Sequence, residues 1–286
     1  MTDLLSGLST LADRYDVLLC DVWGVIHNGV ESFPQACQAL VNWRAHHGPV
    51  ILISNSPRPS ADVVAQLDAL GVPREAWSAF VTSGDATRAL LRDRAPGPVW
   101  TVGPDRDMVL YNDLGLDFAG VDEAAFISVT GLYEDEIENP EDYRERLTAA
   151  AGRGLPLICA NPDRVVQRGS RLIYCGGALA DLYEGLGGEV LMAGKPFAPI
   201  YDLALAEAHA LKGGPVDRSR VLCIGDGVIT DVKGAQDQDL ACLFIAKGIH
   251  GEAAVGADGQ LDPAKVEGLL AAESVSAAHA MGDLVW

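Results

Sequence analysis

The sequence lacks any apolar run near the roughly 20 residues that a membrane-spanning helix needs. Its N-terminal stretch, which carries Asp3 and Asp13, also lacks the basic start and apolar centre of a signal peptide. Only six cysteines are present, none of them in a CxxC pair, and most lie in apolar runs. We therefore predict reduced cysteines in a buried core, and a soluble, cytoplasmic protein without a membrane partner.

Positive charge is also scarce, since 21 lysines and arginines stand against 40 aspartates and glutamates, for a net charge of −19. This balance argues against nucleic acid and anionic membranes as partners. An anionic substrate would instead need a locally positive pocket or a metal ion. Hydrophobic residues make up 49% of the 286 residues, so we expect a globular protein with a large core and two domains.

Strand and helix patterns alternate along nearly the whole chain. The expected strands are 16–20, 49–53, 99–102, 125–129, 155–160, 221–224 and 241–245. The expected helices are 34–47, 60–70, 82–94, a polar helix near 141–151, and 199–211. Such alternation is typical of a mainly parallel sheet with helices on both faces. We therefore predict a doubly wound α/β fold with a Rossmann-like sheet.

Two clusters of proline and glycine interrupt this alternation, at 95–98 and at 185–188. The segment between them has its own strands and helices. We predict that 97–189 form an inserted α/β cap domain, and that 1–96 and 190–286 form the core domain. The alternative is that both clusters are ordinary surface loops of one larger sheet.

An aspartate follows the first predicted strand. The apolar run Val17 to Cys20 is followed by Asp21, and Gly24 comes three residues later. In open α/β sheets, ligands bind at the carboxyl ends of strands. A carboxylate there, before a turn that glycine makes easy, is placed to act as a nucleophile or to bind a cation. Alternatively, Asp21 only caps the turn.

Two further segments suit an anion. Ser54 and Asn55 end the second strand just before a helix, where side-chain donors, backbone N–H groups and the helix dipole converge. The alternative is that this segment caps the helix, a role that Ser60 could also fill. Lys195 lies before the helix 199–211 and could place a point charge near a phosphate or a carboxylate, although its tripeptide with Gly194 and Pro196 is common.

Two more aspartates follow the strand 221–224. Asp226 and Asp231 lie five residues apart across a turn that contains Gly227. Mg²⁺ typically binds one or two carboxylates and keeps several water molecules, so this pair favours a Mg²⁺ site. Asp231 could also cap the following helix, which is compatible with supporting the metal's water shell.

In their order along the chain, these four segments resemble the motifs of the haloacid dehalogenase superfamily of phosphotransferases. Additional segments resemble its class IIA, the NagD-like, p-nitrophenyl phosphatase-like and pyridoxal phosphatase-like group, which has a large α/β cap. These segments are Gly29, Thr82 to Thr87, Asn161 to Asp163, and Gly194 to Pro196. The resemblance covers about residues 14–250 and implies a core with an inserted cap, and a small phosphorylated molecule as substrate. Relatives are commonly homodimers through the cap, which would make the cap a dimer interface here.

The resemblance implies a role for each residue that would contact the phosphate. Asp21 would be the nucleophile that forms an aspartyl-phosphate. Ser54 and Asn55 would bind the transferring phosphoryl group, and Lys195 would bridge the charges of the nucleophile and the phosphate. Arg58 occupies the position where relatives keep an arginine near the entrance of the active site.

The resemblance also implies how the metal is bound. Asp21, Asp226 and the backbone carbonyl of Trp23 would be ligands of Mg²⁺, and Asp231 would support the water molecules of the metal. These roles agree with the chemistry of phosphoryl transfer, which needs an in-line nucleophile and cations that stabilise the spread charge.

Trp23 departs from the family's pattern. Phosphatases of the family usually carry a second aspartate at this position, which protonates the leaving group and then activates water. Such an acid or base typically contributes roughly 10²–10⁴ in rate, and an indole cannot replace it. Two alternatives to a phosphatase therefore stay open. One is a phosphate-binding or regulatory protein with vestigial turnover, and the other is a dehalogenase or C–P hydrolase, although dehalogenases do not need Asp226 and Asp231.

Three further features stay ambiguous. Ser56 replaces an asparagine that relatives often have, so substrate specificity cannot be transferred from them. His27 and Asn28 are interpreted as loop-forming rather than acid/base residues. The acidic segment 134–142 is interpreted as a solvated loop and helix start, or alternatively as a cap element that repels anionic parts of wrong substrates.

Overall fold

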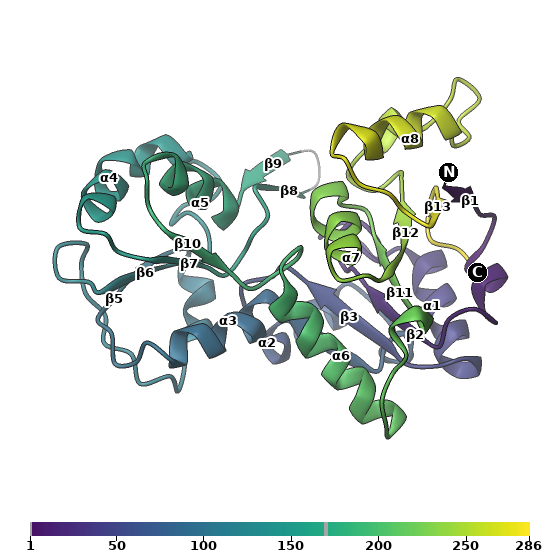
Figure 1. The fold of residues 1–286 in the computed structure, drawn as a ribbon, viewed down its shortest axis with the longest axis horizontal. Helices are drawn as coiled ribbons and strands as arrows, with labels where there is room; N and C mark the ends of the chain where they lie inside the picture. The colour runs from purple at the N-terminus through teal and green to yellow at the C-terminus, as the bar shows by residue number, and fades with distance from the viewer. Residues whose placement is uncertain (1, 169–170) are drawn as a thin grey trace. The chain divides into compact units, whose positions relative to one another are not determined.

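The computed structural model describes residues 2–168 and 171–286. The chain forms two compact units, each with its own parallel sheet (Figure 1). The core unit comprises Met1–Ser54, Val64–Val81 and Tyr201–Trp286, and the cap unit comprises Asn55–Val63 and Thr82–Ile200. The predicted α/β class is confirmed, as is a separate parallel sheet for the inserted segment.

The core unit has a seven-stranded sheet in the order β1-β13-β12-β11-β2-β3-β4. The strands are β1 (Asp3–Leu4), β2 (Val17–Cys20), β3 (Val50–Ser54), β4 (Ala79–Thr82), β11 (Val221–Gly225), β12 (Ala241–Ile245) and β13 (His279–Met281). The ladders from β1 to β3 along this order are all parallel. All residues of β2 and β11 are buried, as expected for parallel strands covered on both faces.

Strand register determines which residues meet at the edge of this sheet. Cys20 in β2 pairs with Ile224 in β11 on one side and with Leu52 in β3 on the other. The three central strands therefore end at nearly the same level. As a result, the residues that follow them emerge at one edge.

Helix α1 begins at Pro34, as predicted. Proline suits this position because its fixed backbone angle fits the first turn of a helix. The buried face of α1 includes Leu40 and Trp43. The α-helices that precede Ser83 or follow Met192 in the chain are α1 (Pro34–His46), α2 (Ser60–Ala69), α6 (Ala198–Lys212), α7 (Lys233–Asp237) and α8 (Pro263–Ala272). Asp231 lies in a single π-helical turn, Val228–Val232, just before α7.

The cap unit has a four-stranded parallel sheet in the order β10-β7-β6-β5. Its strands are β5 (Val99–Val102), β6 (Phe126–Val129), β7 (Leu157–Cys159) and β10 (Val190–Met192), and β8 (Val165–Arg168) and β9 (Arg171–Tyr174) form an antiparallel pair. Its helices are α3 (Ser83–Arg92), α4 (Arg144–Gly152) and α5 (Gly176–Gly185).

Alternate residues of the cap strands pack on opposite faces of the sheet. Ile127 packs in one cluster with Leu147 of α4 and Leu179 of α5. Its neighbour Phe126 packs in a second cluster with Leu91 of α3. The cap unit thus has a hydrophobic core on each side of its own sheet, which explains why α3 groups with it.

The predicted domain limits of 97–189 stay a prediction. The cap unit of the structure also includes α3 and β10, since Val190 pairs with Leu157 in the cap sheet. Local sequence breakers do not reveal such pairing, because a strand joins a sheet through hydrogen bonds to residues that are remote in sequence.

All six cysteines are buried thiols, in agreement with the sequence prediction. Within the described ranges, no helix combines the length and hydrophobicity that a membrane crossing requires.

Candidate functional site

Three carboxylates meet at the edge of the core sheet. They belong to Asp21 after β2, Asp226 after β11 and Asp231 in the π-helical turn. All three are buried, and one ligand oxygen of each lies within 4.8 Å of the others. The N–H of Asp21 donates to the carbonyl of Ile224 at 2.8 Å, so the β2–β11 ladder itself sets the direction of the nucleophile candidate.

Glycines confine two of these carboxylates. A Cβ atom at Gly24, where φ is +87°, would lie 2.1 Å from Asp226 Oδ2, and one at Gly248 would lie 2.2 Å from the same oxygen. A Cβ atom at Gly225 would lie 2.2 Å from Asp231 Cγ. Any side chain at these glycines would collide with a carboxylate, so the backbone can approach this closely only as glycine.

Backbone N–H groups further orient the same two carboxylates. Ile249 N donates to Asp226 Oδ2 at 2.7 Å, and Gly227 N donates to Asp231 Oδ2 at 3.0 Å. Buried carboxylates that lie this close repel one another when charged. Oxygen donors of this kind suit a hard divalent cation, whose charge would offset the repulsion. The residues present therefore fit a metal site.

The side chain of Trp23 packs within its own loop. A Cβ atom at Gly29, where φ is +83°, would lie 2.3 Å from Trp23 Cη2. The rings of Trp23 and His27 meet edge to face, with 5.2 Å between their centroids and 72° between their planes. The indole of Trp23 therefore packs against Gly29 and His27, and metal binding by the Trp23 carbonyl stays a prediction.

His27 is buried and neutral in this loop. Its Nδ1 accepts a hydrogen bond from Gly29 N at 3.0 Å, and its carbonyl accepts one from Gly24 N at 2.8 Å. Burial lowers the pKa of His27 from 6.5 to about 4. Asn28 Oδ1 accepts hydrogen bonds from two N–H groups of the following turn. These contacts favour the loop-forming interpretation of both residues.

Asn55 and Lys195 meet in the cap unit, although 140 positions separate them. Asn55 Oδ1 accepts from Lys195 N at 2.7 Å, and Asn55 Nδ2 donates to the Lys195 carbonyl at 3.1 Å. Nδ2 also donates to Asp163 Oδ1 at 2.8 Å. Both residues are almost fully buried. The Asn55 side chain therefore orients the backbone that carries Lys195.

Asp163 was not among the predicted site residues. The signal that could have found it is its motif with Asn161 and Pro162 after β7, at another strand end. Asn161 Oδ1 accepts from Asp163 N at 3.1 Å, which shapes this turn. Gly194 is required nearby, because a Cβ atom there would lie 2.6 Å from Asn55 Oδ1.

The motif from Thr82 to Thr87 stabilises the segment that follows Asn55. Thr82 and Asp85 form a capping box at the start of α3. Asp85 also accepts from Ser60 N at 3.1 and 3.2 Å, and Thr82 Oγ1 donates to the Arg58 carbonyl at 2.8 Å. This motif therefore holds the chain around Arg58.

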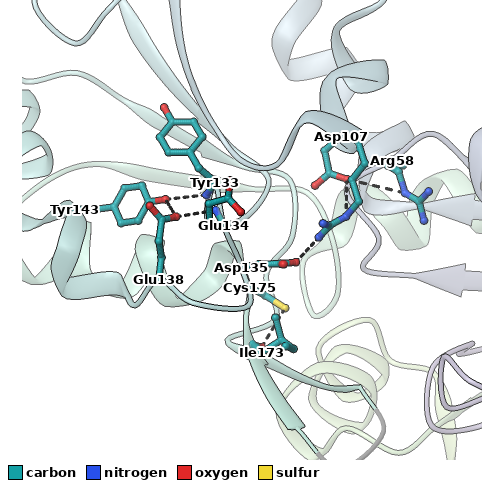
Figure 2. A network of polar contacts seen from close by, with 10 residues as sticks. Arg58, Asp107, Tyr133, Glu134, Asp135, Glu138, Tyr143, Ile173 and Cys175 are labelled. Atoms are coloured by element: carbon teal, nitrogen blue, oxygen red, sulfur yellow. Dashed lines mark hydrogen bonds and ion pairs between the residues drawn. The ribbon is translucent and has the colours of Figure 1, made fainter.

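Arg58 itself joins a charged network in the cap unit that the sequence did not predict (Figure 2). Its Nε lies 4.0 Å from Asp107 Oδ1, and Arg106 Nε lies 4.0 Å from the same oxygen. Arg106 also pairs with Asp135. Burial raises the pKa of Asp107, although Arg106, a hydrogen bond from Thr130 and Arg58 all act in the opposite direction.

Most acidic side chains of the segment 134–142 make local contacts. Glu138 accepts from the Tyr143 hydroxyl at 2.6 Å and from Glu134 N at 2.8 Å (Figure 2). The other contacts pair Asp135 with Arg106, Glu136 with Arg171, Glu141 with Arg144, and Asp142 with Asn139. These bonds favour the loop and helix-start interpretation over a freely repelling surface.

The structure thus groups the predicted site residues by unit. Asp21, Asp226 and Asp231 come together in the core unit, where Ser54 ends β3. Asn55 and Lys195 come together in the cap unit, which also contains Arg58.

Family models match two parts of the chain. A model of haloacid dehalogenase-like hydrolases matches residues 18–117, and a second, of HAD-like hydrolases, matches residues 192–272. A hydrolase of the haloacid dehalogenase-like family from Brucella suis 1330 has a crystal structure that is 48% identical. The match covers 98% of this chain and 100% of that chain, with a TM-score of 0.88.

More distant proteins share the fold, or align with most of the chain at low identity. NagD from E. coli K-12 is 19% identical, with a TM-score of 0.69 over 94% of this chain and 97% of its own. The 5'-nucleotidase YutF of Bacillus subtilis is 23% identical over 82% of this chain and 88% of its own. The D-glycerol 3-phosphate phosphatase of Mycobacterium tuberculosis is also 23% identical, over 85% of this chain and 66% of its own.

Proposed function

Because the chain belongs to the haloacid dehalogenase-like hydrolase family and has the class IIA fold, we propose that it is a Mg²⁺-dependent phosphatase. Its substrate would be a small phosphomonoester, such as a sugar, nucleotide or cofactor phosphate. The observation that carries this proposal is the buried cluster of Asp21, Asp226 and Asp231. The names of the relatives from Bacillus subtilis and Mycobacterium tuberculosis, a nucleotidase and a glycerol phosphatase, support the substrate class.

Asp21 is the proposed nucleophile. Its carboxylate attacks phosphorus in line, a bond to the leaving oxygen breaks, and an aspartyl-phosphate forms. Water then attacks this phosphorus, which releases inorganic phosphate and restores the carboxylate. The continuation of the β2–β11 ladder to Asp21 supports this role, since a nucleophile must be oriented before it reacts.

Asp21, Asp226 and the carbonyl of Trp23 would hold the Mg²⁺, and Asp231 would support its water molecules. A bound Mg²⁺ would offset the charge that develops on the phosphoryl oxygens. The glycines that confine Asp226 and Asp231 support this assignment, because they let the backbone approach these carboxylates closely, and a cation would offset the repulsion between them.

Ser54 and Asn55 are the proposed ligands of the phosphoryl group, and Lys195 would compensate its charge together with that of the nucleophile. The hydrogen bonds between Asn55 and the backbone of Lys195 support a joint role. Arg58 would act at the entrance of the site. A chain with a net charge of −19 needs such local cations to bind an anion.

The leaving group receives no proton from the usual aspartate, because Trp23 takes its place. His27 is a poor substitute, since its pKa of about 4 leaves it uncharged at neutral pH. We therefore expect aryl phosphates, which leave as weak bases, to react faster than alkyl phosphates. The same observation favours a second candidate, a phosphate-binding or regulatory protein with vestigial turnover.

A phosphate-release screen tests the proposal. Purified protein is incubated with p-nitrophenyl phosphate, glycerol 3-phosphate and nucleoside monophosphates, with Mg²⁺ or with EDTA. We expect release that needs Mg²⁺ and that disappears in Asp21→Asn, while Asp237→Asn, a surface control, keeps it. Binding of phosphate without turnover would select the second candidate. Halide release from haloacids in EDTA would select a dehalogenase.

We further propose a cytoplasmic homodimer that associates through the cap. The six buried thiols support a reducing compartment. Leu172 and Tyr174 in β9 are exposed apolar side chains on the cap unit, which supports a contact there. Light scattering after size exclusion would measure the mass. A dimer that Leu172→Asp converts to a monomer is the expected result, and a monomeric wild type would contradict it.

A further inference from the structure

The charged network around Asp107 lies at an edge of the cap sheet where ligands are expected. Asp107 follows β5, Asp135 follows β6, Asp163 follows β7 and Lys195 follows β10. These four strands are parallel, so their following loops emerge at the same edge. Open α/β sheets bind ligands at this edge. The network therefore shares an edge with the segment that carries Lys195.

Asp107 holds two guanidinium groups beside one oxygen. Arg58 Nε and Arg106 Nε each lie 4.0 Å from Asp107 Oδ1, so these two nitrogens are separated by at most twice that distance. Asp107 is only 4% exposed, and Thr130 donates a hydrogen bond to it. Gly103 makes this possible, because a Cβ atom there would lie 1.8 Å from Thr130 Oγ1.

Both guanidinium groups can be reached from solvent. The side chain of Arg58 is 25% exposed and that of Arg106 is 49% exposed, whereas the Asp107 side chain between them is 6% exposed. Arg58 follows Asn55 by three residues, so their Cα atoms are at most about 11 Å apart. That span suits a small molecule whose phosphate lies near Asn55.

The charges of the network favour a second, singly charged anion. Asp107 lies beside both arginines and Asp135 pairs with Arg106, so a carboxylate with one negative charge is repelled less here than a phosphate with two. Burial raises the pKa of Asp107. Guanidinium groups bind carboxylates through paired hydrogen bonds.

On the premise of the proposed phosphatase function, we propose that Arg58 and Arg106 form a subsite for a carboxylate on the leaving group of the substrate. The physiological substrate would then be a phosphomonoester of a hydroxy acid. Arg106, with Asp135 and Asp107 as the residues that position it, would be a specificity residue outside the groups that contact the phosphate.

Two esters that differ in one group test this subsite. Glycerol 3-phosphate and 3-phosphoglycerate share a phosphate and a three-carbon chain, but only the second carries a carboxylate. We expect kcat/KM of the wild type to be about 10- to 100-fold higher for 3-phosphoglycerate, mainly through KM, as charged hydrogen bonds of this kind contribute. Equal values, or a preference for glycerol 3-phosphate, would overturn the proposal.

Substitution of Arg106 sharpens the test. In Arg106→Gln, we expect the ratio of the two kcat/KM values to fall about 10- to 100-fold, and in Arg106→Lys to fall by less. Arg144→Gln is the matched control, since Arg144 pairs with Glu141 on the surface of the same unit. An unchanged ratio in folded Arg106→Gln, checked by circular dichroism, would contradict the role of Arg106.

Calorimetry separates this proposal from the phosphatase proposal. Asp21→Asn protein is titrated with each ester in the presence of Mg²⁺. Tighter binding of 3-phosphoglycerate that is lost with Arg106→Gln would support the carboxylate subsite even if the wild type hydrolysed neither ester. Equal affinity of the two esters would refute the subsite even if the wild type hydrolysed both.

Discussion

The core and cap units place different groups after the carboxyl ends of their parallel strands. At the core edge, the side chains are the carboxylates of Asp21, Asp226 and Asp231. At the cap edge, Asp107, Asp135 and Asp163 follow β5, β6 and β7, and Lys195 follows β10. Parallel strands therefore lead to a cluster of three carboxylates in one unit, and to a mixture of aspartates and a lysine in the other. The role of a strand end is therefore set by the residue that lies there, and not by the fold alone.

The two edges also differ in how they are built. At the core edge, Gly24, Gly225 and Gly248 leave room for carboxylates that no other residue would allow. In the cap unit, hydrogen bonds of the Asn55 side-chain amide hold the backbone of Lys195. Substitutions at the core edge should therefore change activity through charge and steric fit. Substitutions at the cap edge should change activity through the loss of hydrogen bonds and cations.

The largest expected effect is that of Asp226→Ala at the core edge. The variant should lose Mg²⁺-dependent phosphate release by at least about 10²-fold, because even indirect support of a metal ligand contributes up to that amount. Mg²⁺ should also cease to raise the melting temperature, since a ligand stabilises only the fold that binds it. Both are measured by phosphate release and by thermal denaturation with and without Mg²⁺.

Asp237→Ala is the control for this experiment, since Asp237 pairs with Lys233 on the surface of the same unit. It should keep both the activity and the Mg²⁺ shift. Full turnover of Asp226→Ala in EDTA would show that the carboxylate cluster has another role.

Lys195→Gln tests the cap edge in the same assays. We expect kcat/KM to fall about 10²–10³-fold, as is typical when a group that stabilises transition-state charge is removed. The Mg²⁺-induced rise in melting temperature should persist, because the carboxylate cluster belongs to the core unit. If Mg²⁺ no longer raised the melting temperature of this variant, the proposal that metal binding depends on the core edge and not on Lys195 would be contradicted. Lys233→Gln serves as the surface control.

Trp23→Asp tests whether the core edge lacks only an acid. A general acid contributes roughly 10²–10⁴, and we expect the new carboxyl group to recover about 10-fold in alkyl phosphate turnover, because its position is not optimised. For the wild type, kcat should decrease steeply as the pKa of the leaving group rises, and phosphoenzyme should accumulate as a burst. A flat wild-type plot would mean that another residue supplies the proton.

The last prediction concerns stability rather than rate, through the pH dependence of the loop around His27. Burial lowers the pKa of His27 to about 4 from 6.5, so the unfolded chain binds more protons between these values. The contribution of His27 to the free energy of unfolding therefore keeps its full value above pH 6.5. It decreases by at most about 3 kcal/mol as the pH falls from 6.5 toward 4.

In His27→Asn, urea denaturation should show a shallower loss of stability over the same pH range. The asparagine oxygen can still accept the Gly29 N–H bond, which makes this variant a conservative one. Burial also lowers the pKa values of His250 and His279, but both residues remain in the variant, so the difference isolates His27. Parallel curves for the two proteins would contradict the buried, neutral state.

The strands at the centre of the core sheet were predictable from the sequence. β2 and β11 are continuous apolar runs because parallel strands are buried on both faces, and Asp21 and Asp226 could therefore be placed at strand ends. Edge elements were not predictable in the same way. The stretch from Ser274 to Trp286 gave no signal, yet it contains β13, a strand of three residues held by β12 and β1.

The sequence by itself determined the order of the motifs and the residue types at the strand ends, because both follow from local patterns of hydrophobicity and turns. Only the tertiary structure decided that Asn55 bonds to Lys195, that Asp107 lies between Arg58 and Arg106, and that His27 is neutral. These features depend on pairing, register and burial between segments that are remote in sequence. No local pattern records which loop a parallel strand brings to its neighbour, so contact and desolvation set these properties after folding.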